Sequence, residues 1–164
     1  MVIALLSLVG VFIALYLTLY KVGIIGELTC TVGSCETVNT SRYALFVGLP
    51  VAAWGLGAYV VLFALAIAGL QPAYSASRGV TWAILGVAGW SVLFSGWLTY
   101  LELFVIHAIC MWCVTSAVLI ALIFVAALAD VRATGAAAIP PDGTADAASE
   151  PDATAPQRFG AVGR

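Results

Sequence analysis

Four long stretches without a single charged side chain constrain the fold of this chain more than any other feature. They cover residues 2–20, 49–70, 80–101 and 110–129. Each is close to the length of about 20 apolar residues with which a helix crosses the hydrocarbon core of a bilayer. Only 9% of the 164 residues are charged, too few to cover a soluble domain of this size. The sequence therefore predicts an all-α integral membrane protein, a bundle of four transmembrane helices.

The first of these stretches has an alternative interpretation as a secretion signal. It lacks a basic segment in front of it, its apolar part is too long, and no small-residue cleavage site follows. We therefore interpret residues 2–20 as the first transmembrane helix.

The chain divides into two parts by composition. Residues 1–129 contain the four apolar stretches and form the predicted membrane domain. Residues 130–164 are rich in Ala, Pro, Gly, Asp and Thr, without apolar periodicity, so we expect a disordered C-terminal tail. The six Lys and Arg residues are scattered, which argues against a nucleic-acid partner, since phosphate binding needs clustered cations.

The four cysteines form two close pairs, Cys30-x4-Cys35 and Cys110-x2-Cys113. The first pair lies in the polar connection 21–48, which must lie outside the bilayer or on its surface. The second pair follows the very short link 104–109. Because four spans put alternate connections on opposite sides, both pairs are predicted at one face of the membrane and both termini at the other.

Charge does not orient the protein, because Lys21 and Arg42 on one side balance Arg78 and Arg132 on the other. Disulfides persist in oxidising compartments, so the cysteine pairs are assigned to the outer, periplasmic-type side. Both termini are then expected in the cytoplasm.

The spacing of Cys110 and Cys113 is typical of redox chemistry. Residues three apart share one helical face, which allows a disulfide between them. The positive end of the predicted helix favours a thiolate at Cys110. Cys113 lies one turn deeper, within reach of a lipid-soluble oxidant.

The loop pair, Cys30 and Cys35, is predicted to exchange disulfides with a soluble partner and then with the membrane pair. Electrons would pass from a partner dithiol to Cys30/Cys35, then to Cys110/Cys113 and finally to a membrane acceptor. Two static structural disulfides are an alternative. A zinc site is disfavoured because one pair begins inside a membrane helix, so no metal is expected.

Two further features accompany the cysteine pairs: Ser41 lies six residues after Cys35, and Gly48-Leu49-Pro50-Val51 lies at the start of the second apolar stretch. Together with the two cysteine pairs, these motifs resemble the vitamin K epoxide reductase family, in particular its bacterial members, over residues 2–129. The resemblance implies a four-helix bundle around a quinone pocket, capped by the outer loop. It implies that Cys30 and Cys35 are the shuttle pair, that Cys110 and Cys113 are the active-site pair, and that Cys113 lies nearest the quinone. Ser41 matches a loop hydroxyl at the active site, although a simple helix-capping role fits equally well.

The resemblance also implies an activity: reoxidation of a DsbA-like thioredoxin-fold partner with reduction of ubiquinone or menaquinone in the bacterial inner membrane. Many bacterial relatives have Pro where this chain has Met111. Vertebrate members have Tyr where this chain has Ala117, which argues against vitamin K epoxide as the substrate. The residues after Ala129 are too few for a fused thioredoxin-like domain, so the partner is expected to be a separate protein.

Two other classes of function fit parts of the pattern. A DsbB-type oxidase of a different fold family also has four helices and two cysteine pairs, but its C-x-x-C is expected in the first outer loop. A membrane scaffold with structural disulfides is the second. Two further residues lie near the C-x-x-C: His107 as a proton donor or an interface residue, and Glu102 as a helix-end charge that reaches water.

Overall fold

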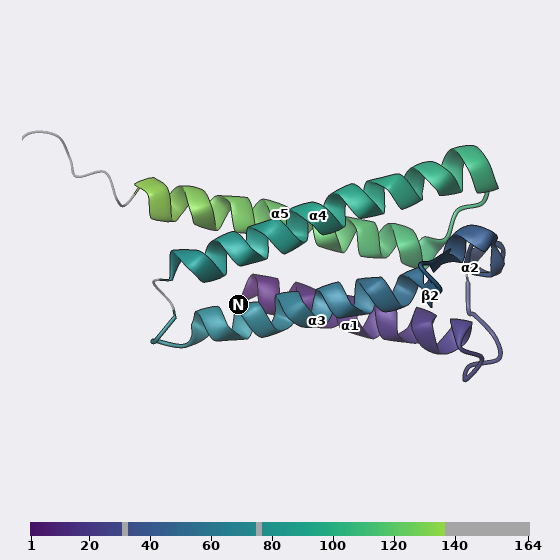
Figure 1. The fold of residues 1–164 in the computed structure, drawn as a ribbon, viewed down its shortest axis with the longest axis horizontal. Helices are drawn as coiled ribbons and strands as arrows, with labels where there is room; N and C mark the ends of the chain where they lie inside the picture. The colour runs from purple at the N-terminus through teal and green to yellow at the C-terminus, as the bar shows by residue number, and fades with distance from the viewer. Residues whose placement is uncertain (31–32, 75–76, 137–164) are drawn as a thin grey trace, which may run out of the picture.

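Four long helices make up most of the computed structural model, which describes residues 1–30, 33–74 and 77–136, with side chains as far as residue 133. All four are long and apolar enough to cross a membrane. Figure 1 shows them side by side along the long axis, α1 next to α3 and α4 next to α5. The predicted all-α membrane bundle is confirmed. The helices are α1 (Val2–Lys21), α3 (Val51–Leu70), α4 (Arg78–Leu101) and α5 (Met111–Ala136).

The helix ends lie close to those expected from the sequence, with one correction. α3 begins directly after Pro50, whose φ of −55° already suits a helix. α5 does not end at Ala129 but continues to Ala136, so residues 130–136 are helical. Arg and Ala are strong helix formers, and a helix that leaves the lipid has no need to stop there. Residues 137–164 lie outside the described residues, and the disorder expected of them stays a prediction.

The connection between α1 and α3 folds into a cap over one end of the bundle. It contains the short helix α2 (Cys35–Thr40), the 3-10 turn η1 (Arg42–Ala44), and the antiparallel strands β1 (Leu45–Phe46) and β2 (Leu49–Pro50). At the same end, α4 continues into the π-helical turn η2 (Glu102–Ile106) before the chain enters α5. Figure 1 shows α2 and β2 beside this link, so both cysteine pairs lie at the same end of the molecule.

The core of the bundle is apolar and closely packed where the helices meet. Leu62, Ala88 and Ile123, from three different helices, are almost completely buried. Gly10 of α1 faces the ring of Tyr59, which a Cβ at that position would overlap. This close approach lets the buried Tyr59 side chain occupy the space between α1, α3 and α5.

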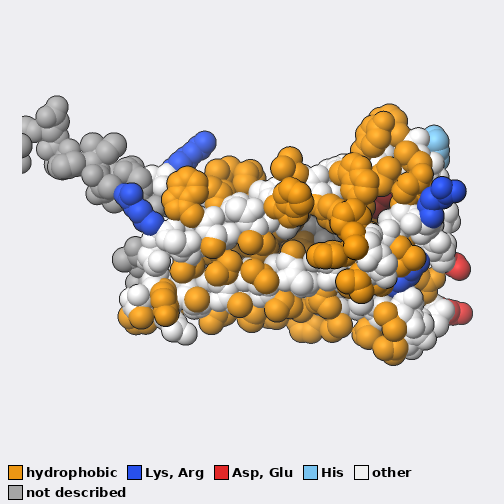
Figure 2. Space-filling view, in the orientation of Figure 1, with side chains coloured by type: hydrophobic (Ala, Val, Ile, Leu, Met, Phe, Trp, Pro, Cys, Tyr) orange, Lys and Arg blue, Asp and Glu red, His pale blue; other side chains and the backbone are white. Residues whose placement is uncertain are grey.

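The outer flank of the bundle is apolar as well. Large side chains such as Phe12, Trp90 and Leu93 are mostly exposed along it. Figure 2 shows apolar side chains along the whole flank, with the Lys, Arg, Asp, Glu and His side chains of that face gathered at the two ends. A flank of this kind suits lipid as its solvent, with the charged ends in the interfacial regions.

Candidate redox site

The cysteine loop is docked on the start of α5 by backbone contacts. Gly33 forms an antiparallel bridge with Cys110, and the Ser34 N–H donates a hydrogen bond to the Ile109 carbonyl at 2.9 Å. Gly33 has a φ of +90°, and a Cβ there would collide with the Ile109 carbonyl oxygen. The glycine is therefore needed for docking as well as for the shape of the loop.

A second set of contacts holds the N-terminal half of the loop. The Trp112 indole Nε1–H donates to the Thr29 carbonyl at 3.0 Å, and the Thr29 N–H donates to the Tyr16 hydroxyl at 3.1 Å. The Tyr16 and Trp112 rings lie 5.4 Å apart between centroids. Trp112, which lies within the C-x-x-C, thus connects the cysteine loop to both α1 and α5.

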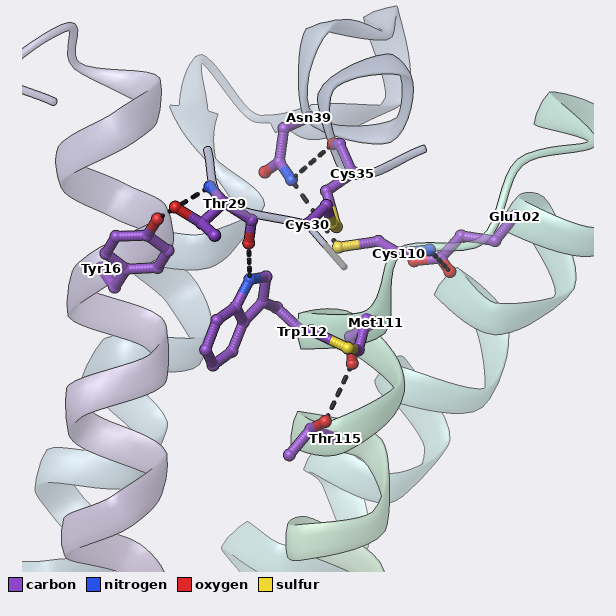
Figure 3. The surroundings of a disulfide bond; sticks show 10 residues. All are labelled: Tyr16, Thr29, Cys30, Cys35, Asn39, Glu102, Cys110, Met111, Trp112 and Thr115. Atoms are coloured by element: carbon purple, nitrogen blue, oxygen red, sulfur yellow. Dashed lines mark hydrogen bonds between the residues drawn. A yellow bond between two sulfur atoms is a disulfide. The ribbon is translucent and has the colours of Figure 1, made fainter. Parts of the chain in front are cut away.

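Cys30 and Cys35 are joined by a disulfide, with 6.2 Å between their Cα atoms. Cys35 is 1% exposed, whereas Cys30 is half-buried. Figure 3 shows the Cys110 sulfur pointing toward this disulfide. Cys35 and Cys110 lie in one buried cluster with Val38, against which Cys30 and Cys113 pack. The four predicted cysteines are thus brought together in a single site.

Asn39 bridges the two pairs, a role that sequence reasoning missed. Its Nδ2 donates to the Cys35 carbonyl at 3.0 Å and lies 3.9 Å from the Cys110 Sγ. The side chain is buried, and its backbone carbonyl accepts a hydrogen bond from Lys21 Nζ. An amide donor at this sulfur stabilises charge on it in the buried cluster.

Cys110 and Cys113 are free thiols on successive turns at the start of α5. Cys110 is 0% exposed and lies directly before the helix. A hydrogen bond from the Cys113 side chain holds the pKa of Cys110 below its usual range, with help from the Trp112 and Cys113 backbone N–H groups. The thiolate predicted at Cys110 is therefore favoured by its neighbouring thiol first, and by the helix start second.

Glu102 does not reach water, contrary to expectation. The side chain is 5% exposed, and its Oε2 accepts a hydrogen bond from the Cys110 N–H at 3.3 Å. The Glu102 and Cys113 side chains both line the cavity described next. The interpretation as a helix-end charge was wrong because the helical path continues through η2. The chain turns only at His107, which is left-handed and exposed.

A cavity of about 640 Å³ extends from the cap into the bundle. This is within the size range of small-molecule sites, and most of its wall is apolar. His107 is not among the described residues that line it. Polar side chains in the wall come from the cap and from all four long helices, and include Lys21, Asn39, Ser41, Tyr59, Glu102 and Cys113.

Two hydroxyl groups in the cavity wall are already engaged. The Ser41 hydroxyl donates to the Val38 carbonyl at 2.7 Å at the end of α2, so the residue both caps that helix and faces the cavity. The Tyr59 hydroxyl donates to the Ser116 carbonyl at 2.8 Å and lies 3.0 Å from the Ser116 hydroxyl. Tyr59 was missed from the sequence because a Tyr in an apolar span reads as ordinary core.

Fold and site together define a membrane protein with two adjacent cysteine pairs beside an apolar cavity, and Cys113 lies in the wall of that cavity. The same conclusion follows from comparison with known families. Residues 1–128 match the family model described as the vitamin K epoxide reductase family, and the chain belongs to that family. It is therefore a multi-pass membrane oxidoreductase of the kind that acts on thiols and quinones. This membership decides against a DsbB-type oxidase of a different fold family.

Proposed function

We propose that this protein reoxidises a DsbA-like thioredoxin-fold partner and reduces a membrane quinone, so that disulfides form in the partner's substrates. The observation that carries the proposal is the buried contact between the loop pair and Cys110, directly above the cavity that Cys113 lines. Two dithiol couples that touch one another beside an apolar cavity form a path for electrons. A scaffold has no need of free thiols at such a place.

The partner meets the loop pair at Cys30, since Cys30 is half-buried and Cys35 is buried. A partner thiolate attacks the Cys30 sulfur and releases Cys35 as a thiolate. The partner's second thiol then attacks the mixed disulfide and frees Cys30. The partner leaves oxidised, and the loop pair carries its two electrons.

The loop pair then reduces the membrane pair by the same chemistry. The Cys35 thiolate attacks Cys110 of a Cys110–Cys113 disulfide and releases Cys113 as a thiolate, after which Cys30 regenerates the loop disulfide. The arrangement of a loop disulfide with free Cys110 and Cys113 corresponds to the state after this step. The electrons then lie on the pair that faces the cavity.

The cavity fits a quinone ring in size and in chemistry. Its wall is mainly apolar, and the Cys113 thiol forms part of it. A quinone supplies an acceptor for two electrons and two protons. Cys113 is the sulfur in contact with the ring in this proposal, and the residues of the cap, including Ser41, exclude water above it. Ubiquinone and menaquinone both satisfy these requirements.

The proposed location is the bacterial inner membrane, with the cysteine end facing the periplasm and the termini in the cytoplasm. The loop disulfide supports this orientation, because disulfides persist on the oxidising side of a membrane. Disulfide formation is favoured over epoxide reduction because Ala117 lacks the hydroxyl of vertebrate relatives.

The proposal is tested by mixing the purified full-length protein with a reduced DsbA-type partner and a short-chain quinone analogue. Partner oxidation and quinone reduction are expected in equal amounts, and Cys113→Ser is expected to abolish both. Omission of the quinone is the control and limits the protein to a single turnover. A Cys113→Ser protein that worked at the wild-type rate would overturn the relay. Loop cysteines that stayed oxidised in the presence of reduced partner would favour the scaffold.

A further inference from the structure

Glu102 is a buried carboxyl group that the cysteine relay does not use. It lies 5% exposed in a turn between two membrane helices, where an unpaired charge is costly. Its carboxylate accepts a hydrogen bond from the Cys110 N–H of the C-x-x-C, with 3.3 Å between nitrogen and oxygen. The side chain also lines the cavity together with Cys113.

Oxidation of the C-x-x-C requires that the Cys110 and Cys113 thiols lose their protons in apolar surroundings. When two thiols become a disulfide, two S–H bonds break and one S–S bond forms, and the two electrons and two protons end on the hydroquinone. Cys113 lies inside the membrane span, where a free thiolate and a proton released into lipid are both unfavourable. A base beside the sulfur in the cavity wall removes this difficulty, because a proton that moves from the thiol to the base leaves the summed charge of the two groups unchanged.

We propose that Glu102 is the catalytic base that takes the proton from the Cys113 thiol and delivers it to the quinone oxygen. The Glu102 carboxylate becomes a carboxylic acid as the Cys113 sulfur becomes nucleophilic, and it returns to carboxylate when the hydroquinone forms. The Cys110 proton leaves to the water at the membrane surface, and the second proton of the hydroquinone comes from that water. This inference rests on the proposed thiol–quinone chemistry.

Among the described residues of the cavity wall, Glu102 is the one that carries a carboxyl group. The other titratable groups in that wall are Lys21 of α1, Tyr43 of η1, Tyr59 of α3 and Cys113 of α5. Lys21 donates to the Asn39 carbonyl, and Tyr59 donates to the Ser116 carbonyl. Cys110, whose N–H donates to Glu102, is a further titratable residue beside it.

The first test measures the proton without the quinone. In a full-length Cys110→Ser protein with the loop disulfide intact, Cys113 is the one free thiol, and its alkylation by a small neutral maleimide is followed against pH. If Glu102 takes the proton, Glu102 and Cys113 together hold one proton over a range around neutral pH. The fraction of Cys113 that is thiolate is then constant, so the alkylation rate does not change with pH in that range. Glu102→Gln should instead give a rate that rises about tenfold per pH unit, because the proton then goes to solvent.

The second test measures turnover in the otherwise unchanged protein, with a small dithiol as donor and a short-chain quinone as acceptor. Glu102→Gln keeps an acceptor for the Cys110 N–H but is no base, and we expect quinone reduction to fall about 100-fold, as for loss of a general base. Glu27→Gln, an exposed loop glutamate, is the matched control and should keep the wild-type rate.

The outcomes separate the base from a structural role. A Glu102→Gln protein with the wild-type rate and the wild-type alkylation profile overturns the inference and leaves the proposed function intact. A wild-type protein that does not reduce the quinone contradicts the proposed function itself. If the Glu102→Gln protein does not fold, the test uses the Cys110→Ser protein, which keeps Glu102. An alkylation rate of Cys113 that rises steadily, about tenfold per pH unit, in that protein overturns the inference.

Discussion

At the residue scale, Cys110 is the point where the two cysteine couples meet. It is completely buried, faces the loop disulfide, and receives hydrogen bonds from the thiol and backbone around it. The Cys113 side chain makes the largest contribution to the lowered pKa of Cys110. A hydrogen bond to the thiolate favours the charged form, so its loss should raise the pKa.

This dependence predicts different results for two substitutions of Cys113. Cys113→Ala removes the donor, so the pKa of Cys110 should rise and its alkylation at neutral pH should slow. Cys113→Ser keeps a hydroxyl donor and should stay closer to the wild type. The measurement is the pH profile of Cys110 alkylation in protein whose loop pair is oxidised. Identical profiles for the Ala and Ser proteins would contradict a role for this hydrogen bond.

At the element scale, the site depends on how the loop between α1 and α3 docks on the start of α5. The bridge from Gly33 to Cys110 and the hydrogen bond from Trp112 to Thr29 hold it at two places. These contacts bring a half-exposed cysteine to the surface and a buried one to the C-x-x-C. In the proposed relay, this docking determines which cysteine meets the partner and which meets Cys110.

Gly33→Ala should weaken this docking. The Ala Cβ would collide with the Ile109 carbonyl at a backbone conformation that L residues rarely adopt, which costs on the order of 1–3 kcal/mol. We expect faster alkylation of Cys35 after mild reduction and partner oxidation about tenfold slower. Gly26→Ala is the control, because a Cβ there meets nothing within 4 Å. Equal behaviour of the two variants would show that docking does not depend on Gly33.

The sequence predicted the helices well and the cap poorly, for physical reasons. Uninterrupted apolar spans have one stable solution in lipid, so their number and limits followed from composition. The roles of Asn39 and Glu102 depend on which polar groups the cap brings together. No periodicity reveals such contacts, and Glu102 was assigned to water because the π-helical turn that buries it has no sequence signature.

At the scale of the whole molecule, the fold brings a polar cap and an apolar bundle together at one membrane face. The bundle provides a cavity of about 640 Å³ with Cys113 in its wall, and the cap provides a second cysteine pair above it. Membership in the vitamin K epoxide reductase family fits this division. The proposed activity requires both parts at once, because neither couple alone reaches both a soluble partner and the lipid.

The most direct measurement asks whether the two couples exchange electrons through Cys35 and Cys110. In a Cys30→Ser, Cys113→Ser double variant, mild oxidation should give a Cys35–Cys110 disulfide in nearly all molecules, detected by peptide mass spectrometry. The Cys35→Ser, Cys113→Ser protein, which keeps Cys30 instead, should form far less of a bond to Cys110. A double variant whose Cys35 and Cys110 both stayed free would contradict the relay.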